Sequence, residues 1–388
     1  MTTLLDAHIQ WVNRPPDERY LNLEDLLAGV QARKDRSDEF NHVEVGGLWA
    51  NVIEEGPQAG ELYCAKLPDG SPLLFTHWSF SQYTTLVGGP DVRWLREMPA
   101  EISAQALNDS IQHRGRVAHP SGDYPGSLAK LYVASGAEGE PGWMRALTSP
   151  TYGRIYDEQL VRAVIRLNHD GRWVVPGKVA GNGWADMYAE VTKQSTTLYA
   201  SDRDCFIFLV DEEHPVEVDG ERYFRGLITS NSEVGKATLT LKSFLCVGVC
   251  CNRIIHKATN IKQLDIRHTS QGPIKFLEEA EPALETYSNA DTSSERALIT
   301  AAKATSVGSD KEEAQRWLRD RGFSKQESIT LPMLAEQATD IGSSGDPTSL
   351  WDLVAAGTAY AREIEHADSR VDFEEKVGNL LDRYVTQR

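Results

Sequence analysis

The sequence has no apolar run approaching the roughly 18 residues of a membrane-spanning helix, so no transmembrane segment is expected. Its start, Met1–Asp6, lacks the basic residues and apolar core of a secretory signal. Only five cysteines occur in 388 residues, an odd and sparse set that suits a reducing cytoplasm rather than a disulfide framework. The net charge of −17 argues against a uniformly basic surface that coats nucleic acid. We therefore expect a cytoplasmic globular protein.

Recognisable catalytic motifs are also missing. The sequence contains no Gly-x-Ser-x-Gly elbow, no His-Glu-x-x-His pair and no dinucleotide-binding Gly-x-Gly-x-x-Gly. The segment 230–238 approaches a phosphate-binding loop, but Ser230 replaces its first glycine and Ala237 replaces its magnesium-binding hydroxyl. Gly235 and Lys236 in that turn could still bind a single phosphate through backbone N–H groups. We therefore predict no cofactor and assign no catalytic residue.

The cysteines near the middle of the chain are the obvious metal candidates. Cys246-x3-Cys250 has a formally acceptable spacing for zinc. On an extended segment, however, Cys246 and Cys250 share one face and Cys251 lies on the other, because side chains alternate. Buried free cysteines pack like small apolar side chains. We therefore predict that these three cysteines bind no metal; stoichiometric zinc that is lost in Cys246→Ser and Cys250→Ser variants would contradict this.

The apolar pattern predicts an α+β fold, with a mixed α/β core, a mostly antiparallel sheet and an all-helical C-terminal tail. Cys205–Val210 is apolar throughout, which is typical of a strand buried on both faces. Arg222–Ser230 is predicted as a second strand, and Ala237–Cys251 as a third long extended run or a strand that continues into a helix. We expect residues 237–251 at the centre of the core. Ala100–Gln112 is predicted as a helix with Ile102, Leu107 and Ile111 inward.

The same patterns divide the chain into three regions. Residues 1–60 form a helical and short-strand segment, 61–271 the core, and 272–388 the helical region. The Gly- and Pro-rich stretch 115–142 is predicted as a loop inserted in the core. In the helical region the pattern places Phe276, Leu277, Ala280 and Leu284 on the buried side.

Charge is unevenly distributed along the chain. Residues 220–270 hold eight Lys and Arg against three Asp and Glu, a net charge of +5. Residues 271–388 hold 13 basic and 22 acidic residues, a net charge of −9. A basic stretch within an acidic protein can attract an anion locally. Alternatively, its cations pair with acidic segments of the fold, and the sequence leaves both interpretations open.

Five segments together resemble a known family. They are 223–236, 250–255 and 267–269, with supporting similarity at 147–155 and 349–352. They resemble the phage/plasmid-like protein family of unknown function, which is found in prophages, plasmids and phages. The resemblance runs from about residue 70 to 365 and is most specific over 223–269; it does not cover the first 60 residues or the loop 115–142. It implies a role in the DNA metabolism of mobile elements and supplies no catalytic residues.

The leading hypothesis is a protein that binds nucleic acid, expected to be single-stranded DNA, during replication or recombination. Such an annealing-type role needs no catalysis. Cations would contact phosphates, directional hydrogen bonds would come from Asn and His, and rings such as Tyr223 and Phe224 would stack on bases. A homo-oligomer would bring several basic segments together. The candidate nucleic-acid-binding residues are Arg225, Asn231, Lys236, Asn252, Arg253, Arg267 and His268.

Two alternatives from other classes stay open. One is an enzyme with an unrecognised polar site around Asn231, Lys236, Asn252 and Arg267, with Glu233 and His268 nearby in the sequence. The other is a structural or host-interaction protein that docks through its acidic helical tail. Convergence of these side chains in a closed pocket would favour the enzyme, whereas a continuous open groove would favour nucleic acid.

Overall fold

The computed structural model describes most of the chain, with a few gaps. The described residues are 18–67, 69–116, 128–137, 140–175, 191–193, 196–211, 213–247, 253–255, 264–337, 344–361, 364 and 373–381, of which 114–116, 246, 247 and 253–255 are described by their backbone only. In these residues no helix is long and apolar enough to span a membrane.

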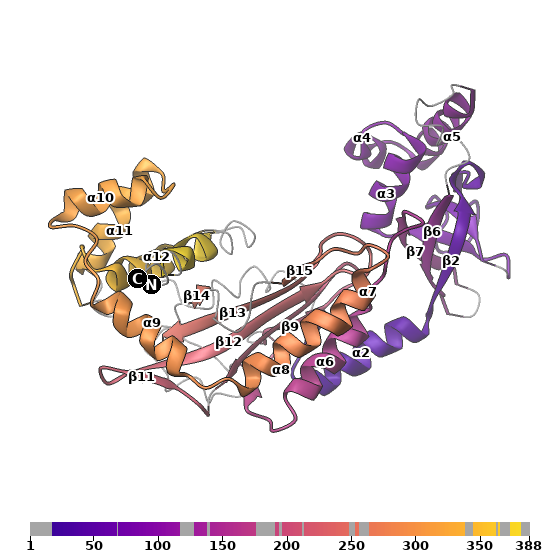
Figure 1. The fold of residues 1–388 in the computed structure, drawn as a ribbon. Coiled ribbons are helices and arrows are strands. Elements are labelled where there is room, and N and C mark those ends of the chain that lie inside the picture. Colours follow the sequence, from indigo (N-terminus) through magenta and orange to yellow (C-terminus); the bar gives the residue numbers. More distant parts are fainter. Residues whose placement is uncertain are drawn as a thin grey trace.

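A nine-stranded antiparallel sheet, sheet A, forms the centre of the molecule (Figure 1). Its main path runs β1-β9-β10-β12-β13-β14, and β8, β11 and β15 pair with β10, β12 and β13. The strands are β1 (Arg19–Tyr20), β8 (Trp173–Val174), β9 (Leu198–Ala200), β10 (Cys205–Asp211), β11 (Val216–Val218), β12 (Glu221–Asn231), β13 (Leu239–Val247), β14 (Arg253–Ile255) and β15 (Leu264–Ile266).

The three strands predicted from apolar runs form the middle of sheet A. Every residue of β10 is buried, as expected for a strand covered on both faces. β12 pairs with β10 on one side and with β13 on the other. Leu239, Leu241 and Phe244 of β13 are 0–1% exposed, which confirms that this strand belongs to the core.

Helices cover one face of sheet A. α2 (Leu23–Asp35), α6 (Asp157–Leu167) and α8 (Glu281–Asn289) lie side by side along it (Figure 1). Leu26, Val161 and Leu284 from these helices share an apolar cluster with Ile207 and Leu227 of the sheet. α8 continues the short helix α7 (Gly272–Lys275) and the π-helical turn η4 (Phe276–Ala280).

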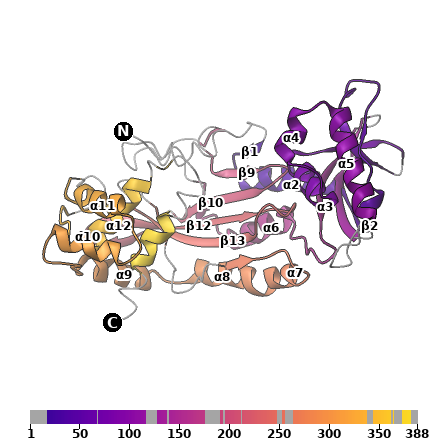
Figure 2. The same ribbon diagram turned by 90° about the horizontal axis from the view of Figure 1, so that it is seen from above.

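A second sheet, sheet B, lies beyond one end of sheet A, together with three helices (Figures 1 and 2). Its six strands run in the order β2-β6-β7-β5-β4-β3, and the β5–β7 pair is parallel. The strands are β2 (Ser37–Glu44), β3 (Asn51–Val52), β4 (Leu62–Lys66), β5 (Pro72–Phe75), β6 (Leu128–Ala134) and β7 (Gly142–Thr148). The helices are α3 (His77–Val87), α4 (Val92–Glu97) and α5 (Ala100–Arg116).

The C-terminal helices gather at the opposite end of sheet A (Figure 2). α9 (Ser293–Lys303), α10 (Lys311–Arg319), α11 (Lys325–Gln337), α12 (Leu350–Ala361) and the helix 373–381 share one apolar cluster. Trp351 of α12 meets Tyr223 of β12 edge to face, with ring centroids 5.3 Å apart, and so fastens this cluster to the sheet. The predicted α+β class with a helical C-terminal region is therefore confirmed.

Three details of the sequence prediction are wrong. The loop predicted at 115–142 contains the strand β6, which pairs with β2 and β7. Ile102 is 48% exposed, because the buried side of α5 is formed by Ala104, Leu107 and Ile111 at helical spacing. Leu277 is 56% exposed, although Phe276, Ala280 and Leu284 are buried as predicted. β2 and β3 precede residue 61 and pair with strands that follow it, so strands from both sides of the predicted boundary at residue 60 belong to sheet B.

Candidate nucleic-acid interface

Lys236 lies in the turn that joins β12 to β13. Gly235 adopts the left-handed conformation there, with φ of +82°, which favours glycine over residues with a side chain. The Lys236 backbone N–H donates to Ser232 Oγ at 3.0 Å. Its side chain is 37% exposed, and Nζ lies 2.9 Å from Asp204 Oδ2. The turn therefore holds a cation at the surface beside a single acidic partner.

β14 and β15 continue the basic stretch along one edge of sheet A. Both strands pair with the side of β13 that faces away from β12. Arg253 is opposite Cys246, and Ile266 is opposite Leu239 near the turn that carries Lys236. Arg267, which follows Ile266 directly, is exposed.

The two arginines are thus far apart along the same edge. Their partner positions on β13 differ by about seven residues, which corresponds to about 23 Å at the usual rise of a strand. We call Lys236, Arg253 and Arg267 the basic edge. Lys257 and Lys262 lie between the two arginines in the sequence, outside the described residues.

Arg225 is placed in the interior and serves the fold. Its side chain is 1% exposed, and Nη2 lies 3.3 Å from Asp211 Oδ2 in the neighbouring strand. Nη1 donates to the carbonyl oxygen of Ala290 at 2.8 Å and to that of Tyr287 at 3.3 Å. Arg225 therefore ties β12 to the end of α8, and its guanidinium is not at the surface.

Asn231 is also buried, at the end of β12. Its Nδ2 donates to the Ile155 carbonyl oxygen and to Asp157 Oδ1, both at 2.8 Å. Asn231 therefore satisfies buried polar groups at the end of the strand.

His268 stacks on Tyr152, with ring centroids 5.1 Å apart and planes 15° apart. Its Nδ1 lies 3.3 Å from the Gly153 carbonyl oxygen. Burial lowers the pKa of His268 to about 4. The imidazole is therefore neutral at pH 7 and adds no positive charge next to Arg267.

The remaining sequence-predicted residues lie partly outside the described residues. Asn252, Cys250 and Cys251 fall in undescribed positions, and Arg253 and Cys246 are described by their backbone only. Within the described ranges, no three His, Cys, Asp or Glu side chains gather as metal ligands do. The rings suggested for base stacking are buried, since Tyr223 is 0% and Phe224 is 2% exposed.

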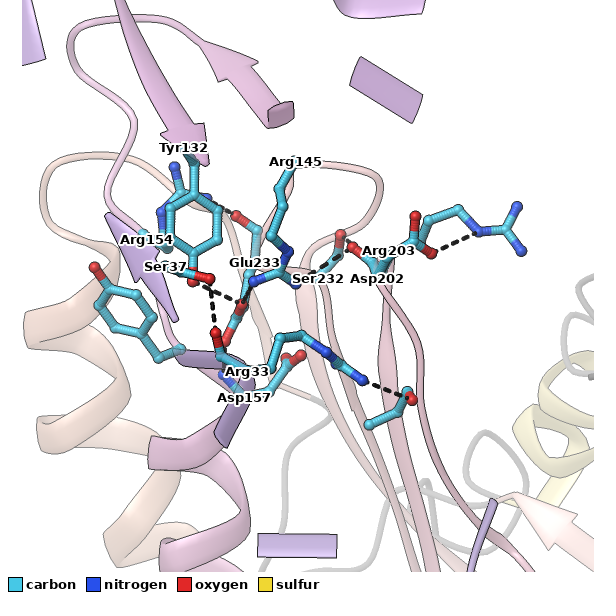
Figure 3. A network of polar contacts seen from close by, with 12 residues as sticks. Arg33, Ser37, Tyr132, Arg145, Arg154, Asp157, Asp202, Arg203, Ser232 and Glu233 are labelled. Carbon is cyan, nitrogen blue, oxygen red and sulfur yellow. Dashed lines mark hydrogen bonds and ion pairs between the residues drawn. The ribbon is translucent and has the colours of Figure 1, made fainter. Parts of the chain in front are cut away.

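A buried polar network, which sequence reasoning missed, joins the two sheets (Figure 3). Glu233, in the turn after β12, lies at its centre. Its Oε2 is 3.0 Å from Arg145 Nη1 of β7 and accepts a hydrogen bond from Tyr132 of β6 at 3.3 Å. Its Oε1 accepts from the Asp157 backbone N–H, at the start of α6, at 2.8 Å. Strands of both sheets and a helix therefore meet at one carboxylate.

Cations and aromatic rings complete this network. We call Glu233, Tyr132, Arg145, Arg154 and Asp157 the junction network. Arg154 donates to the Glu233 carbonyl oxygen and, through Nε, to Glu39 Oε2 of β2 at 2.7 Å. The Arg154 guanidinium carbon is 3.9 Å from the centroid of the Tyr132 ring, and that of Arg145 is 4.8 Å away. Such stacking is favourable for partly desolvated arginines.

The charged groups of the junction network shift one another's pKa values. Burial, reinforced by the Glu233 carboxylate, raises the pKa of Asp157 well above its usual range. Burial alone would lower the pKa of Arg145, but the Glu233 carboxylate raises it overall, so Arg145 stays charged. Glu233 and Arg145 pair at 3.0 Å with both side chains only 3% exposed, which favours a structural role for this pair.

Asn252 of the enzyme alternative lies outside the described residues, and the members of that set that the structure describes do not form one pocket. Asn231 and Glu233 are 1% and 3% exposed and face the interior, whereas Lys236 and Arg267 are at the surface. No family model, curated protein or solved structure matches the chain.

Proposed function

We propose that this protein binds single-stranded nucleic acid, most simply single-stranded DNA, along the basic edge, without catalysis of its own. The observation that supports this is the position of Arg253 and Arg267 towards the two ends of one sheet edge, about 23 Å apart, with Lys236 in the turn near Arg267. A strand with phosphates at regular intervals fits such an edge, and proteins that bind single strands cover about 4–16 nucleotides per domain. The resemblance to phage/plasmid-like proteins is consistent with a role in replication or recombination.

The proposal includes a homo-oligomer in the cytoplasm. The rest of the chain is acidic, and the whole carries a net charge of −17, so one basic edge alone would attract nucleic acid weakly. Several edges in one assembly would form a longer positive track, and simultaneous contacts with one strand strengthen binding without new kinds of contact.

Changing Lys236, Arg253 and Arg267 together to alanine should weaken DNA binding and reduce its salt dependence. Each phosphate contact of a single strand contributes about −0.7 to the slope of log affinity against log salt, so three lost contacts should flatten it by about 2. The measurement is the fluorescence anisotropy of a labelled oligothymidylate of about 20 nucleotides, titrated at several salt concentrations.

A matched control changes three exposed cations of the helical region, Arg316, Arg319 and Lys325, to alanine. This control removes the same amount of charge, and we expect a smaller loss of affinity with an unchanged slope. Thermal unfolding must show that both triple variants are folded. A folded basic-edge variant with wild-type affinity and slope would overturn the proposal, as would a wild-type protein that binds no DNA at low salt.

A further inference from the structure

A pocket of 350 Å³ lies beside sheet B, between β5, β7, the start of β4 with Glu61, and the helices α3, α4 and α5. Phe75 and Phe80 contribute apolar surface, and Trp143 of β7 borders the pocket with 45% of its surface exposed. An exposed tryptophan at the border of a pocket provides a flat surface on which a planar ring can stack. Tyr223 and Phe224, the rings suggested by the sequence for base stacking, are buried and offer no such surface.

Arg96 of α4 supplies a cation to the same pocket. Its Nη2 donates to the His77 carbonyl oxygen at 2.7 Å and to Ser81 Oγ at 3.1 Å, which fixes the guanidinium. The guanidinium carbon also lies 5.6 Å from the centroid of the Phe80 ring. Nε and Nη1 donate to no residue that the structure describes, and they can therefore bind an anionic group of a ligand.

The pocket connects to the basic edge through α3. Thr76 and His77, at the start of this helix, line the pocket. On another side of α3, Trp78 Nε1 and Gln82 Nε2 donate to the Val234 carbonyl oxygen at 3.0 and 2.8 Å, two residues before Lys236. A single helix therefore contacts both the pocket and the turn of the basic edge.

The charges that act on His77 also indicate that the pocket and the turn of the basic edge are close together. Burial lowers the pKa of His77, and the charges of Arg96 and Arg203 lower it further. Arg203 belongs to the loop between β9 and β10, and its carbonyl oxygen accepts from Ser232 Oγ in the Lys236 turn at 2.7 Å. Arg203 Nε lies 3.9 Å from Asp202 Oδ1, so the surface between the basic edge and the pocket carries an ion pair at this point.

We propose that this pocket binds one unstacked nucleotide of the strand that runs along the basic edge, with the base on Trp143 and a phosphate on Arg96. This inference rests on the proposed function and specifies its ligand. A ring stacked on Trp143 and a phosphate paired with Arg96 use two of the groups that line the pocket; the Glu61 carboxylate and the His77 imidazole also line it. Stacking is tolerant of base identity, so the site selects a single strand rather than a sequence.

Changing Trp143 to leucine should lower the affinity for an oligothymidylate of about 20 nucleotides by about 5- to 150-fold, the usual effect of losing one stacked base. Leucine keeps apolar packing but has no ring, whereas Trp143→Phe should bind nearly as well as wild type. Trp94→Leu is the matched control, because Trp94 is 40% exposed on α4 and does not line the pocket. An oligothymidylate of about 6 nucleotides should bind wild type and Trp143→Leu equally, because it can occupy the basic edge alone.

Two substitutions test whether the charge of Arg96 contacts a phosphate. Arg96→Ala should flatten the salt slope for the longer oligonucleotide by about 0.7, and Arg96→Lys should restore the slope. If Trp143→Leu and Arg96→Ala bind like wild type while the basic-edge variant does not, the pocket proposal is wrong and the proposed function stands. Equal losses at both oligonucleotide lengths would also overturn it, since they indicate a structural role. A wild-type protein that binds neither oligonucleotide would overturn both proposals.

Discussion

Replacing Phe244 with alanine is expected to lower the free energy of unfolding by about 3–5 kcal/mol, the usual cost of truncating a buried aromatic side chain. Phe244 is 0% exposed and stacks on Phe208, with ring centroids 4.7 Å apart. Its ring lies directly over Gly226 of β12, where an added Cβ would come within 1.8 Å of it. Alanine would therefore leave a cavity between three neighbouring strands, which the tightly paired backbones cannot close.

The measurement is urea denaturation followed by circular dichroism. Leu277→Ala serves as the control, because Leu277 is 56% exposed and surface changes usually alter stability by less than about 0.5 kcal/mol. Phe244→Leu should cost less than Phe244→Ala, since it removes less volume. A Phe244→Ala variant with an unchanged denaturation midpoint would show that β13 is not in the core.

The parts of the fold that could be predicted are those with a local cause. Cys205–Val210 is apolar at every position, and such a run has few stable placements other than a strand buried on both faces. The helix α3 begins where Thr76 Oγ1 accepts from the Ser79 backbone N–H at 3.1 Å, and it ends at Gly88 in the left-handed conformation. Both ends are visible in the sequence, as a capping threonine and a glycine.

The parts that could not be predicted depend on distant partners. β6 sits next to a Gly- and Pro-rich stretch, and it is a strand because Leu131 pairs with Phe40 on one side and Leu147 on the other. The parallel β5–β7 pair joins segments that are separated by α3, α4 and α5. No local pattern specifies which strands will become neighbours at such separations.

In the candidate site, too, features with a local cause could be predicted and features that depend on distant partners could not. The sequence identified the glycine turn around Lys236, because a turn rich in Ser, Asn and Gly has a local signature. It could not separate surface cations from buried ones: Arg225 lies within an apolar run, and only its pairing with Asp211 and α8 explains its burial. The pocket at Trp143 was missed because its residues come from six elements that are far apart in the sequence.

The junction network gives the second large prediction. Changing Glu233 to glutamine is expected to destabilise the protein by about 3–5 kcal/mol, the usual cost of removing one partner of a buried ion pair. Glu233 and Arg145 are both 3% exposed in their side chains, and the change leaves the Arg145 charge buried without its counter-ion. Because Tyr132 and Arg145 belong to sheet B and Glu233 to the turn of sheet A, the loss should loosen the joint between the sheets.

A double-mutant cycle separates the ion pair from the other contacts of Glu233. Arg145→Met removes the cation but keeps an apolar chain of similar length, and it should also be strongly destabilising because the carboxylate is then unpaired. The double variant should be more stable than the sum of the single changes predicts, by about 1–3 kcal/mol. The exposed pair Arg93–Glu97 is the matched control, since its side chains are 87% and 61% exposed and Glu97→Gln should cost less than about 1 kcal/mol. Urea denaturation gives all these values; strictly additive effects of Glu233→Gln and Arg145→Met would show that the two charges do not depend on each other.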